Sequence, residues 1–338
     1  MTIGGNPLVM KEINTNLVRR VLRAQRSATR QQLAAATGLS IVTVAAIAGQ
    51  LILAGEAREG DQIPSNGGRP SRLVEFNADY AKVLALFAHE IAGKDRLSLR
   101  VANLYGECVD AGEEETAPES LAAFEPLIDR MLAKHPSIKA IGFGLPGIES
   151  GGTIVALDYR PLIGAPIIEH FRLKYGLLVL FENDVNSAVM GCCRRQSIDA
   201  HETVVYLYVP RKYPPGAGIR IGGKLFKGRN NFAGEVAHLP LGIGWGQPEL
   251  YGSFDRICLA IAKLIVALAS VINPDKVILH GEFLGRDHMK AIADICGRDL
   301  PVDVAPRLEV SENFTLDFQT GLIEETLTLL EPINPLSD

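Results

Sequence analysis

The chain has 338 residues, more than one compact core usually holds, so its length predicts two or three domains. Hydrophobic residues make up 47% and charged residues 22%, a balance typical of folded proteins and contrary to disorder. No run approaches the roughly 20 apolar residues of a membrane-spanning helix, and no secretory signal pattern opens the chain. The five cysteines are never spaced as CxxC, which excludes a disulfide scaffold and a cysteine-rich zinc ribbon. We therefore expect a cytoplasmic protein with no membrane partner.

Charge is unevenly distributed along the chain. Residues 1–76 carry nine basic and five acidic side chains, a net charge of +4, whereas the whole chain is −5. Residues 77–338 therefore carry −9. A basic head on an acidic body indicates a nucleic-acid-binding module joined to a domain with another task.

The head shows the pattern of three helices followed by a hairpin. Apolar residues recur at helical spacing over residues 13–26, and a short second helix is expected over 30–37, ended by Gly38. Ser40 is suited to cap a third helix. A turn-rich stretch follows, and residues 69–76 then alternate like a strand. This order predicts a winged helix-turn-helix domain over residues 1–76.

In such a domain the third helix lies in the major groove, and basic side chains neutralise phosphates. The residues we expect to contact DNA are Arg30, Ser40, Thr43, Arg69 and Arg72. The start of the third helix is otherwise apolar, with few donors for base edges. A degenerate head that faces a protein partner is therefore the alternative.

The body, residues 77–338, alternates strand and helix patterns. This alternation indicates an α/β body split into two lobes around a cleft. The strands are expected at 83–88, 97–102, 140–147, 177–181, 203–209 and 217–221, and helices at 121–133 and 254–272.

Four motifs of the body, in order and rough spacing, resemble the ROK family of sugar-responsive repressors and sugar kinases. They are Gly142-Phe-Gly-Leu-Pro-Gly147, Glu182-Asn-Asp-Val-Asn186, Gly216-Ala-Gly-Ile-Arg-Ile-Gly-Gly-Lys-Leu225 and Phe232-Ala-Gly-Glu-Val-Ala-His238. The resemblance implies an actin-like, hexokinase-type body. The head and the following Gly67-Gly68-Arg69-Pro70 resemble the repressor branch. We thus expect a regulator that binds DNA and a sugar or sugar-phosphate effector as a homodimer or tetramer.

Three segments that hold the nucleotide in ROK kinases are altered here. No Asp-Gly pair follows the first body strand, at residues 87–96, and Arg211-Lys-Tyr-Pro-Pro215 stands in the second phosphate loop. The two prolines remove amide donors that a phosphate would need. Leu279-His-Gly-Glu-Phe283 replaces the glycine pair beside adenosine. We therefore expect no ATP binding and no catalytic residue. A kinase with divergent loops, and a ligand-free scaffold for dimerisation or a partner protein, are the alternatives.

The positions that contact the sugar in this family match this sequence better than the nucleotide-binding segments do. The resemblance implies sugar contacts from Asn183, Asp184, Glu235, His238 and Glu249. Asp184 matches the kinase base, but without nucleotide it would only accept hydrogen bonds. One family asparagine aligns near Tyr159. The structural alternatives are a helix cap for Asp184 and a satisfied structural residue for His238.

The resemblance also bears on metal and anion sites. ROK proteins hold zinc through this histidine and three cysteines, but no cysteine follows His238 closely, and Cys258 lies in an apolar helical stretch. One histidine cannot hold a four-coordinate zinc, so we expect no metal and no cofactor, with Trp245 packing against His238. Arg211 and Lys212 form a possible anion site for a sugar phosphate, or else plain polar surface.

Overall fold

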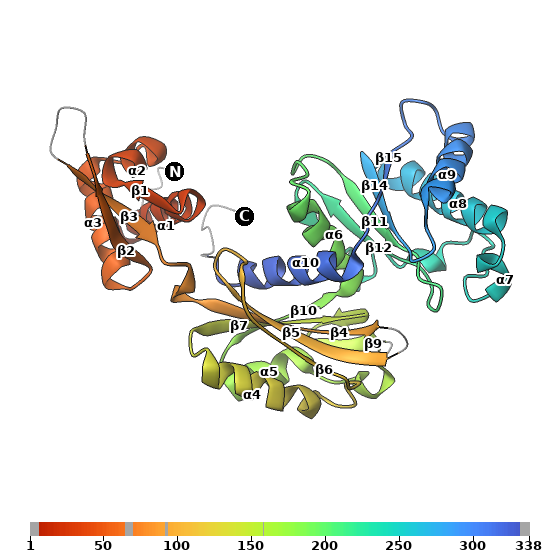
Figure 1. The fold of residues 1–338 in the computed structure, drawn as a ribbon, viewed down its shortest axis with the longest axis horizontal. Helices are drawn as coiled ribbons and strands as arrows, with labels where there is room; N and C mark the ends of the chain where they lie inside the picture. The colour runs from red at the N-terminus through yellow and green to blue at the C-terminus, as the bar shows by residue number, and fades with distance from the viewer. Residues whose placement is uncertain (1–6, 65–69, 92–93, 158, 332–338) are drawn as a thin grey trace, which may run out of the picture.

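The computed structural model describes residues 7–64, 70–91, 94–157 and 159–331. It consists of a small head and a body with two five-stranded sheets. Two helices lie between these sheets, α6 (Asp184–Arg195) and α10 (Phe314–Thr328) (Figure 1). Within the described part, no single helix has the length and apolar character to cross a membrane, and only the bent pair α2 (Arg30–Thr37) and α3 (Ile41–Leu53) together meets those two criteria.

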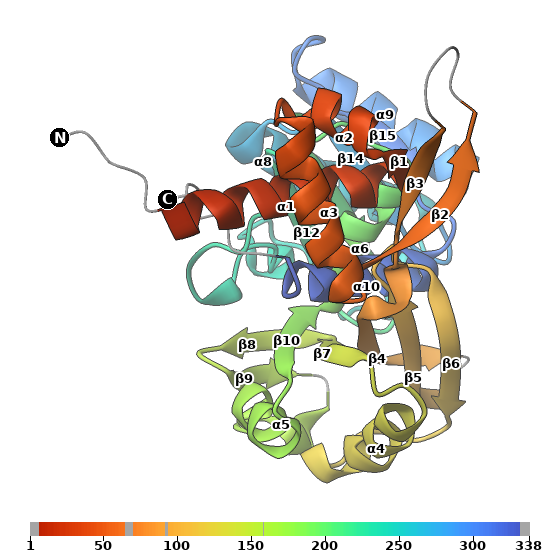
Figure 2. The same cartoon turned by 90° about the vertical axis from the view of Figure 1, so that its left-hand side faces the viewer.

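The head contains three helices and a three-stranded sheet (Figure 2). Its elements are α1 (Pro7–Gln25), β1 (Ser27–Thr29), α2 (Arg30–Thr37), α3 (Ile41–Leu53), β2 (Ala57–Ile63) and β3 (Ser71–Phe76). The predicted caps are confirmed: Gly38 ends α2 in the left-handed region with φ 70°, and the Ser40 hydroxyl accepts the Thr43 amide at 3.1 Å. The helices pack on the sheet through apolar side chains that are almost fully buried, among them Leu22, Leu33 and Val44.

Two parts of the head differ from the sequence prediction. The helix α1 begins six residues before the expected residue 13, and β2 occupies much of the stretch interpreted as turn-rich. The three-residue strand β1 was not predicted at all. So short a strand carries no readable alternation, and it forms because its backbone pairs with β3.

The first lobe of the body is a sheet in the order β10-β7-β4-β5-β6. Its strands are β4 (Lys82–Ile91), β5 (Lys94–Asn103), β6 (Cys108–Glu114), β7 (Ile138–Leu145) and β10 (Leu178–Asn183). Alternate residues of β4 face opposite ways. Leu84 and Leu86 pack with α4 (Glu125–Lys134) and α5 (Ile167–Tyr175), whereas Val83 and Phe87 pack with α10.

The second lobe is a sheet in the order β13-β12-β11-β14-β15. Its strands are β11 (Val204–Tyr208), β12 (Gly216–Ile221), β13 (Lys224–Leu225), β14 (Lys276–His280) and β15 (Arg307–Val310). One face packs with α8 (Phe254–Ile272) and α9 (Arg286–Asp299), and the other packs with α6. The α/β body and its strands at the expected places confirm that part of the prediction, whereas β6, β14, β15, α9 and α10 were not foreseen.

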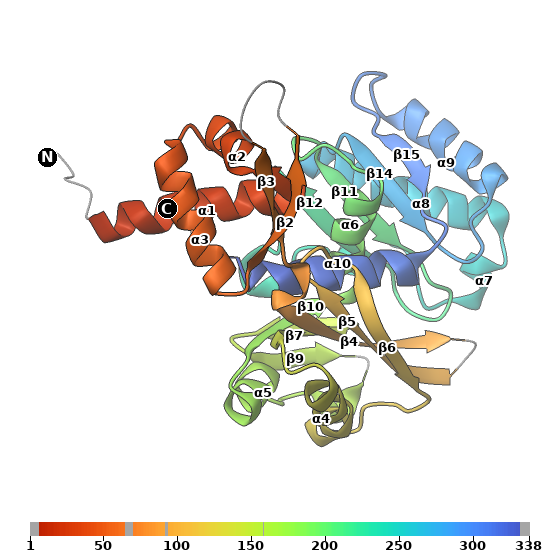
Figure 3. The same cartoon turned by 60° about the vertical axis from the view of Figure 1, so that its left-hand side comes forward.

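The helices α6 and α10 pack closely against each other between the two sheets (Figure 3). Glycines make this approach possible: a β-carbon on Gly321 would overlap the Ser187 carbonyl oxygen, and one on Gly191 would overlap the Asp317 carbonyl oxygen. On β7, a β-carbon at Gly144 would lie 2.6 Å from the Phe318 ring. Gly144, inside β7, thus lets α10 pack closely on the sheet.

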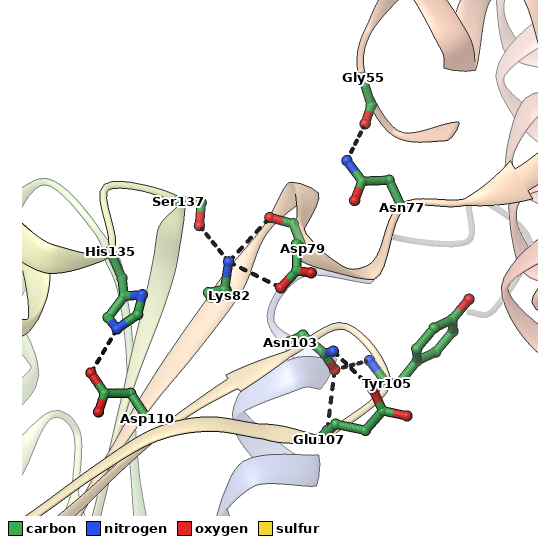
Figure 4. A network of polar contacts seen from close by, with 10 residues as sticks. All are labelled: Gly55, Asn77, Asp79, Lys82, Asn103, Tyr105, Glu107, Asp110, His135 and Ser137. Atoms are coloured by element: carbon green, nitrogen blue, oxygen red, sulfur yellow. Dashed lines mark hydrogen bonds and ion pairs between the residues drawn. The ribbon is translucent and has the colours of Figure 1, made fainter. Parts of the chain in front are cut away.

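The head and the body share one hydrophobic cluster. It joins head residues such as Val18 and Leu22 to body residues on β4 and to Leu327 at the end of α10. Around it, Asn77 donates to the Gly55 carbonyl at 2.8 Å, and Asn103 holds the turn of Tyr105 and Glu107 (Figure 4). The domain boundary predicted after residue 76 stays a prediction. One apolar core contains residues from both sides of it.

Candidate functional site

A cavity of about 1010 Å³ lies between the two lobes. Its walls come from the ends of β4, β7, β10, β11 and β14, from the segment 231–245, and from the first turn of α10. Four of the five predicted sugar-contacting residues line it. They are Asn183, Asp184, Glu235 and His238.

Asn183 and Asp184 stand where β10 passes into α6. The Asn183 Oδ1 accepts the amides of Val185 at 2.9 Å and Asn186 at 3.1 Å, and its Nδ2 donates to the Gly147 carbonyl at 3.1 Å. The cap role considered for Asp184 is therefore filled by Asn183, which keeps one amide hydrogen for a ligand. Asp184 occupies the first helical position, where the positive end of the helix dipole favours a carboxylate.

Glu235 and His238 are positioned by a glycine turn against β12. Gly234 has φ 99°, and a β-carbon there would overlap the Ala217 carbonyl oxygen. Its own carbonyl accepts the Ala217 amide at 2.9 Å, which fixes the segment on the sheet edge. The His238 ring contacts Phe232, with 5.6 Å between ring centres. Trp245, the expected partner of His238, is buried in the core of the second lobe and also lines the cavity, and its packing against His238 stays a prediction.

The other residues predicted to bind a sugar or an anion are Glu249, Arg211 and Lys212, and only one of them lines the cavity. Glu249 is exposed on the short helix α7 (Pro248–Tyr251) and is not among the described residues that line the cavity, so its predicted sugar contact is unsupported. Arg211 also lies outside that lining, with its guanidinium 5.1 Å from the Phe283 ring centre. Lys212 lines the cavity, with its ammonium 5.1 Å from the Tyr213 ring centre.

The altered phosphate loop contributes polar groups that sequence reasoning did not single out as ligands. His89 lines the cavity, and burial lowers its pKa. Asp95 also lines it and accepts a hydrogen bond from the Tyr159 hydroxyl at 3.1 Å. Tyr159, near which the family asparagine aligns, thus places an aromatic ring in the cavity wall. Its hydrogen bond to Asp95 holds the ring there. The sequence had indicated His89 and Asp95 only by their position near the end of a predicted strand.

A buried ion pair supports the floor of the site. The Glu182 carboxylate accepts the Asn183 amide and the Asn186 side-chain amide, each at 3.0 Å, and lies 2.5 Å from the Lys227 ammonium. Burial and the nearby charge of Glu182 raise the pKa of Glu325, on α10, to about 7. Glu182 belongs to the motif Glu182–Asn186 and could be singled out from the sequence. Lys227 and Glu325 could not, because they are far from Glu182 in sequence and approach it only in the folded protein.

The predicted DNA-contacting residues of the head lie on α2, α3 and β3. Ser40 and Thr43 are linked hydroxyl to hydroxyl at 2.8 Å at the start of α3. Arg30 and Arg72 both form ion pairs with Glu59, the former at 3.5 Å. Arg69 lies outside the described residues. The phosphate contacts predicted for Arg30 and Arg72 would thus have to compete with an internal carboxylate.

No group of three or more metal-ligating side chains occurs within the described ranges. Cys258 is buried in α8, and burial raises the pKa of its thiol. The residues around His238 therefore do not fit a zinc ion, whose structural sites take four ligands with thiolate or imidazole donors.

Comparison with known proteins relates this arrangement to a family. Residues 92–250 match the ROK family. The chain is 28% identical over 282 residues to the xylose repressor of Caldicellulosiruptor bescii, a match that covers 80% of this chain and 68% of that repressor.

Solved structures show the same fold. A ROK family transcriptional regulator, a homologue of the E. coli MLC protein, matches 94% of this chain and 97% of its own with 16% identity and a TM-score of 0.69. The ROK hexokinase from Thermus thermophilus matches 74% of this chain and 99% of its own with 19% identity and a TM-score of 0.61. Residues 92–250 are therefore similar to the ROK family, and the body of this chain has the fold of the ROK hexokinase.

Proposed function

We propose that this protein is a sugar-responsive transcriptional regulator. The head, a winged helix-turn-helix, binds DNA, and the body binds a sugar or sugar derivative between its lobes. The protein works in the cytoplasm. It forms a homodimer or tetramer, because two heads on neighbouring half-sites gain affinity and specificity together. Support comes from its likeness to a repressor over most of the chain and from the head that precedes the ROK body.

One observation carries this proposal. The helix α3 buries Val44, Ile47 and Leu51 against the head and leaves its first turn exposed, with Ile41 at 55% and Val42 at 80% exposure. Two exposed aliphatic side chains beside Ser40 and Thr43 fit a helix that contacts thymine methyl groups and phosphates in a major groove. An exposed aliphatic turn also suits the protein-partner alternative, and the likeness to a repressor over 80% of this chain favours DNA.

Phosphoryl transfer is not part of the proposal. It requires the phosphates and Mg²⁺ of the nucleotide to be positioned first, mainly by backbone amides and cations. The corresponding wall of the cavity presents Pro214 and Pro215, which have no amide hydrogen. No zinc and no ATP enter the proposed mechanism.

The effector acts by shifting a population. It must bind one arrangement of head and body better than another, or it cannot change DNA affinity. The helix α10 offers a physical route, since Phe314 and Phe318 line the cavity and Leu327 belongs to the core shared with the head.

The test compares Val42→Glu with Val271→Glu in the full chain, on DNA from the protein's own promoter region. Val42 and Val271 are 80% and 83% exposed, so both changes add the same charge at an exposed position. We expect Val42→Glu to weaken binding by about tenfold or more, because a carboxylate faces phosphates and an apolar base contact is lost. Val271→Glu, on α8, should bind like the wild type. Equal binding by both variants, or no binding by the wild type, contradicts the proposal.

A further inference from the structure

Carboxylates dominate the polar lining of the cavity. Among the described residues that line it, seven are acidic and one is a lysine. The acidic ones are Asp95, Glu149, Glu182, Asp184, Glu235, Glu282 and Glu312. Lys227, which is not among these lining residues, pairs with Glu182 at 2.5 Å. A ligand in this cavity therefore meets a strongly negative potential.

Of the two cations predicted to form an anion site, Arg211 and Lys212, only Lys212 lines the cavity among the described residues. Arg211 lies outside the described lining, with its guanidinium over Phe283. Arg96, near the altered first loop, pairs with Glu113 at 3.7 Å and Glu115 at 3.8 Å. An anionic ligand would thus meet Lys212 and several carboxylates, an arrangement that repels a phosphate group.

His89 gives an independent indication that the cavity suits a polar ligand. Both of its ring nitrogens are buried, and neither has a hydrogen-bond partner among the described residues. The ring stacks on Phe87 with 5.4 Å between ring centres, and burial lowers its pKa, so the neutral imidazole offers one donor and one acceptor. A buried polar group without a hydrogen-bond partner destabilises the fold, and a ligand that hydrogen-bonds His89 would remove that cost.

We propose that the effector is an amino sugar, a carbohydrate that carries a protonated amine and no phosphate. This inference rests on the proposed function and names the ligand class of the same site. An ammonium group donates three hydrogen bonds and has no acceptor, which matches a wall of carboxylates. The ring hydroxyls find donors and acceptors at Asn183, Glu235 and His89.

The experiment is calorimetric titration of the full chain with matched sugars in three ring configurations. Glucose, galactose and mannose are each compared with their 2-amino and 6-phosphate derivatives. We expect an amino sugar to bind about tenfold tighter than its parent sugar, since a charge-assisted hydrogen bond contributes about 1.5–3 kcal/mol. The 6-phosphates should bind more weakly than the parents, and added salt should reduce the advantage of the amine.

A variant pair separates the cavity charge from the overall charge. Glu282 and Glu312 are exposed members of the cavity lining, so Glu282→Gln with Glu312→Gln should fold and lose much of the preference for the amine. Asp294→Asn removes an exposed carboxylate of α9, in the same lobe but outside the described lining, and should keep the preference.

Each outcome decides something. Tighter binding of a 6-phosphate, or equal binding of amine and parent, overturns this inference and leaves the proposed function standing. If no sugar of the series binds while promoter DNA still does, the effector half of the proposed function fails together with the inference. If promoter DNA does not bind but an amino sugar does, only the regulator proposal fails.

Discussion

Glu59 controls how much positive charge the head offers to DNA. It lies on β2 and pairs with Arg30 and Arg72, and the hydrogen bond and charge of Arg72 hold its pKa below its ordinary value. Both arginines are therefore held by one carboxylate at neutral pH. DNA phosphates must replace that carboxylate before either arginine can contact the backbone.

We accordingly expect Glu59→Gln to tighten DNA binding severalfold at low salt. Two released arginines should also steepen the dependence of log affinity on log salt, by about 0.9 for each phosphate that a released arginine neutralises. The measurement is DNA binding across a salt series. Asp61→Asn, an exposed acid on the same strand, is the matched control and should change the salt dependence less. An identical response of the two variants contradicts a specific role for Glu59.

Glu325 makes stability depend on pH. Its pKa is about 7 in the folded protein against an ordinary 4.5, because burial and Glu182 disfavour its charged form. The folded state therefore holds this proton more tightly than the unfolded chain does. The stability that the proton contributes is fully present below about pH 4.5 and is lost as pH rises through 7.

Between pH 5 and 8 the wild type should therefore lose roughly 2 kcal/mol of unfolding free energy more than Glu325→Gln. Urea unfolding at the two pH values measures this difference. The control is Glu324→Gln, at a neighbouring and more accessible carboxylate that pairs with Arg194 at 3.5 Å, and it should follow the wild type. A Glu325→Gln profile parallel to that of the wild type would show that Glu325 is charged when folded.

Local chemistry explains which residues were predictable. Gly38, Ser40 and the strand end at Asn183 were readable because caps and turns depend on neighbours in sequence. The ion pair of Glu182 with Lys227 was not, because 45 residues separate its partners, and no spacing rule joins them. Glu249 was placed by resemblance alone, and the structure puts it at an exposed position of the short helix α7.

At the scale of elements, the crossing of α6 and α10 is the tightest constraint on the body. Gly321→Ala forces the new β-carbon onto the Ser187 carbonyl, so the helices must move apart. We expect a loss of about 3 kcal/mol or more in unfolding free energy. Gly297→Ala, in α9, meets nothing within 4 Å and should instead stabilise by about 0.5–1 kcal/mol through helix propensity. Chemical denaturation of both variants tests the contrast, and equal effects would contradict close packing at the crossing.

The elements that sequence reasoning found were those with strong internal pattern. The buried apolar runs of β4, β7 and β11 and the long apolar face of α8 were readable. By contrast, α10 is mixed in polarity, because it packs between two sheets and has no continuous solvent face. Its buried residues include Asp317 and Thr326 beside apolar ones such as Phe318 and Leu322, so its role became visible only in the fold.

At the scale of the whole molecule, Tyr105 joins the head to the body. The Arg26 guanidinium lies 4.3 Å from its ring centre, and the Phe76 ring centre lies 5.7 Å away. Arg26 also pairs with Glu107 at 2.9 Å, and Arg23 pairs with Glu331 at 3.2 Å beyond the end of α10. From these contacts and the shared apolar cluster we expect the head and the body to unfold as one cooperative unit.

Tyr105→Ala should weaken that unit. We expect a loss of about 2 kcal/mol, from ring packing and from a cation–π contact of about 0.5–1 kcal/mol, and a thermal transition that broadens or divides. Tyr105→Phe keeps the ring and should behave like the wild type. Differential scanning calorimetry distinguishes the two. A single sharp transition in Tyr105→Ala at the wild-type temperature would mean that this contact does not couple head and body.

The apolar cluster that crosses residue 76 also determines how such a regulator can be recombined. A new head grafted at that boundary would bring its own α1 and β3 but would face Tyr105, Glu107 and the end of α10 from the old body. The transplantable piece is therefore larger than the head and discontinuous in sequence. Chimeras that exchange these body residues together with the head should still respond to the effector. A chimera joined only at residue 76 would bring together a head and a body whose contact surfaces do not match.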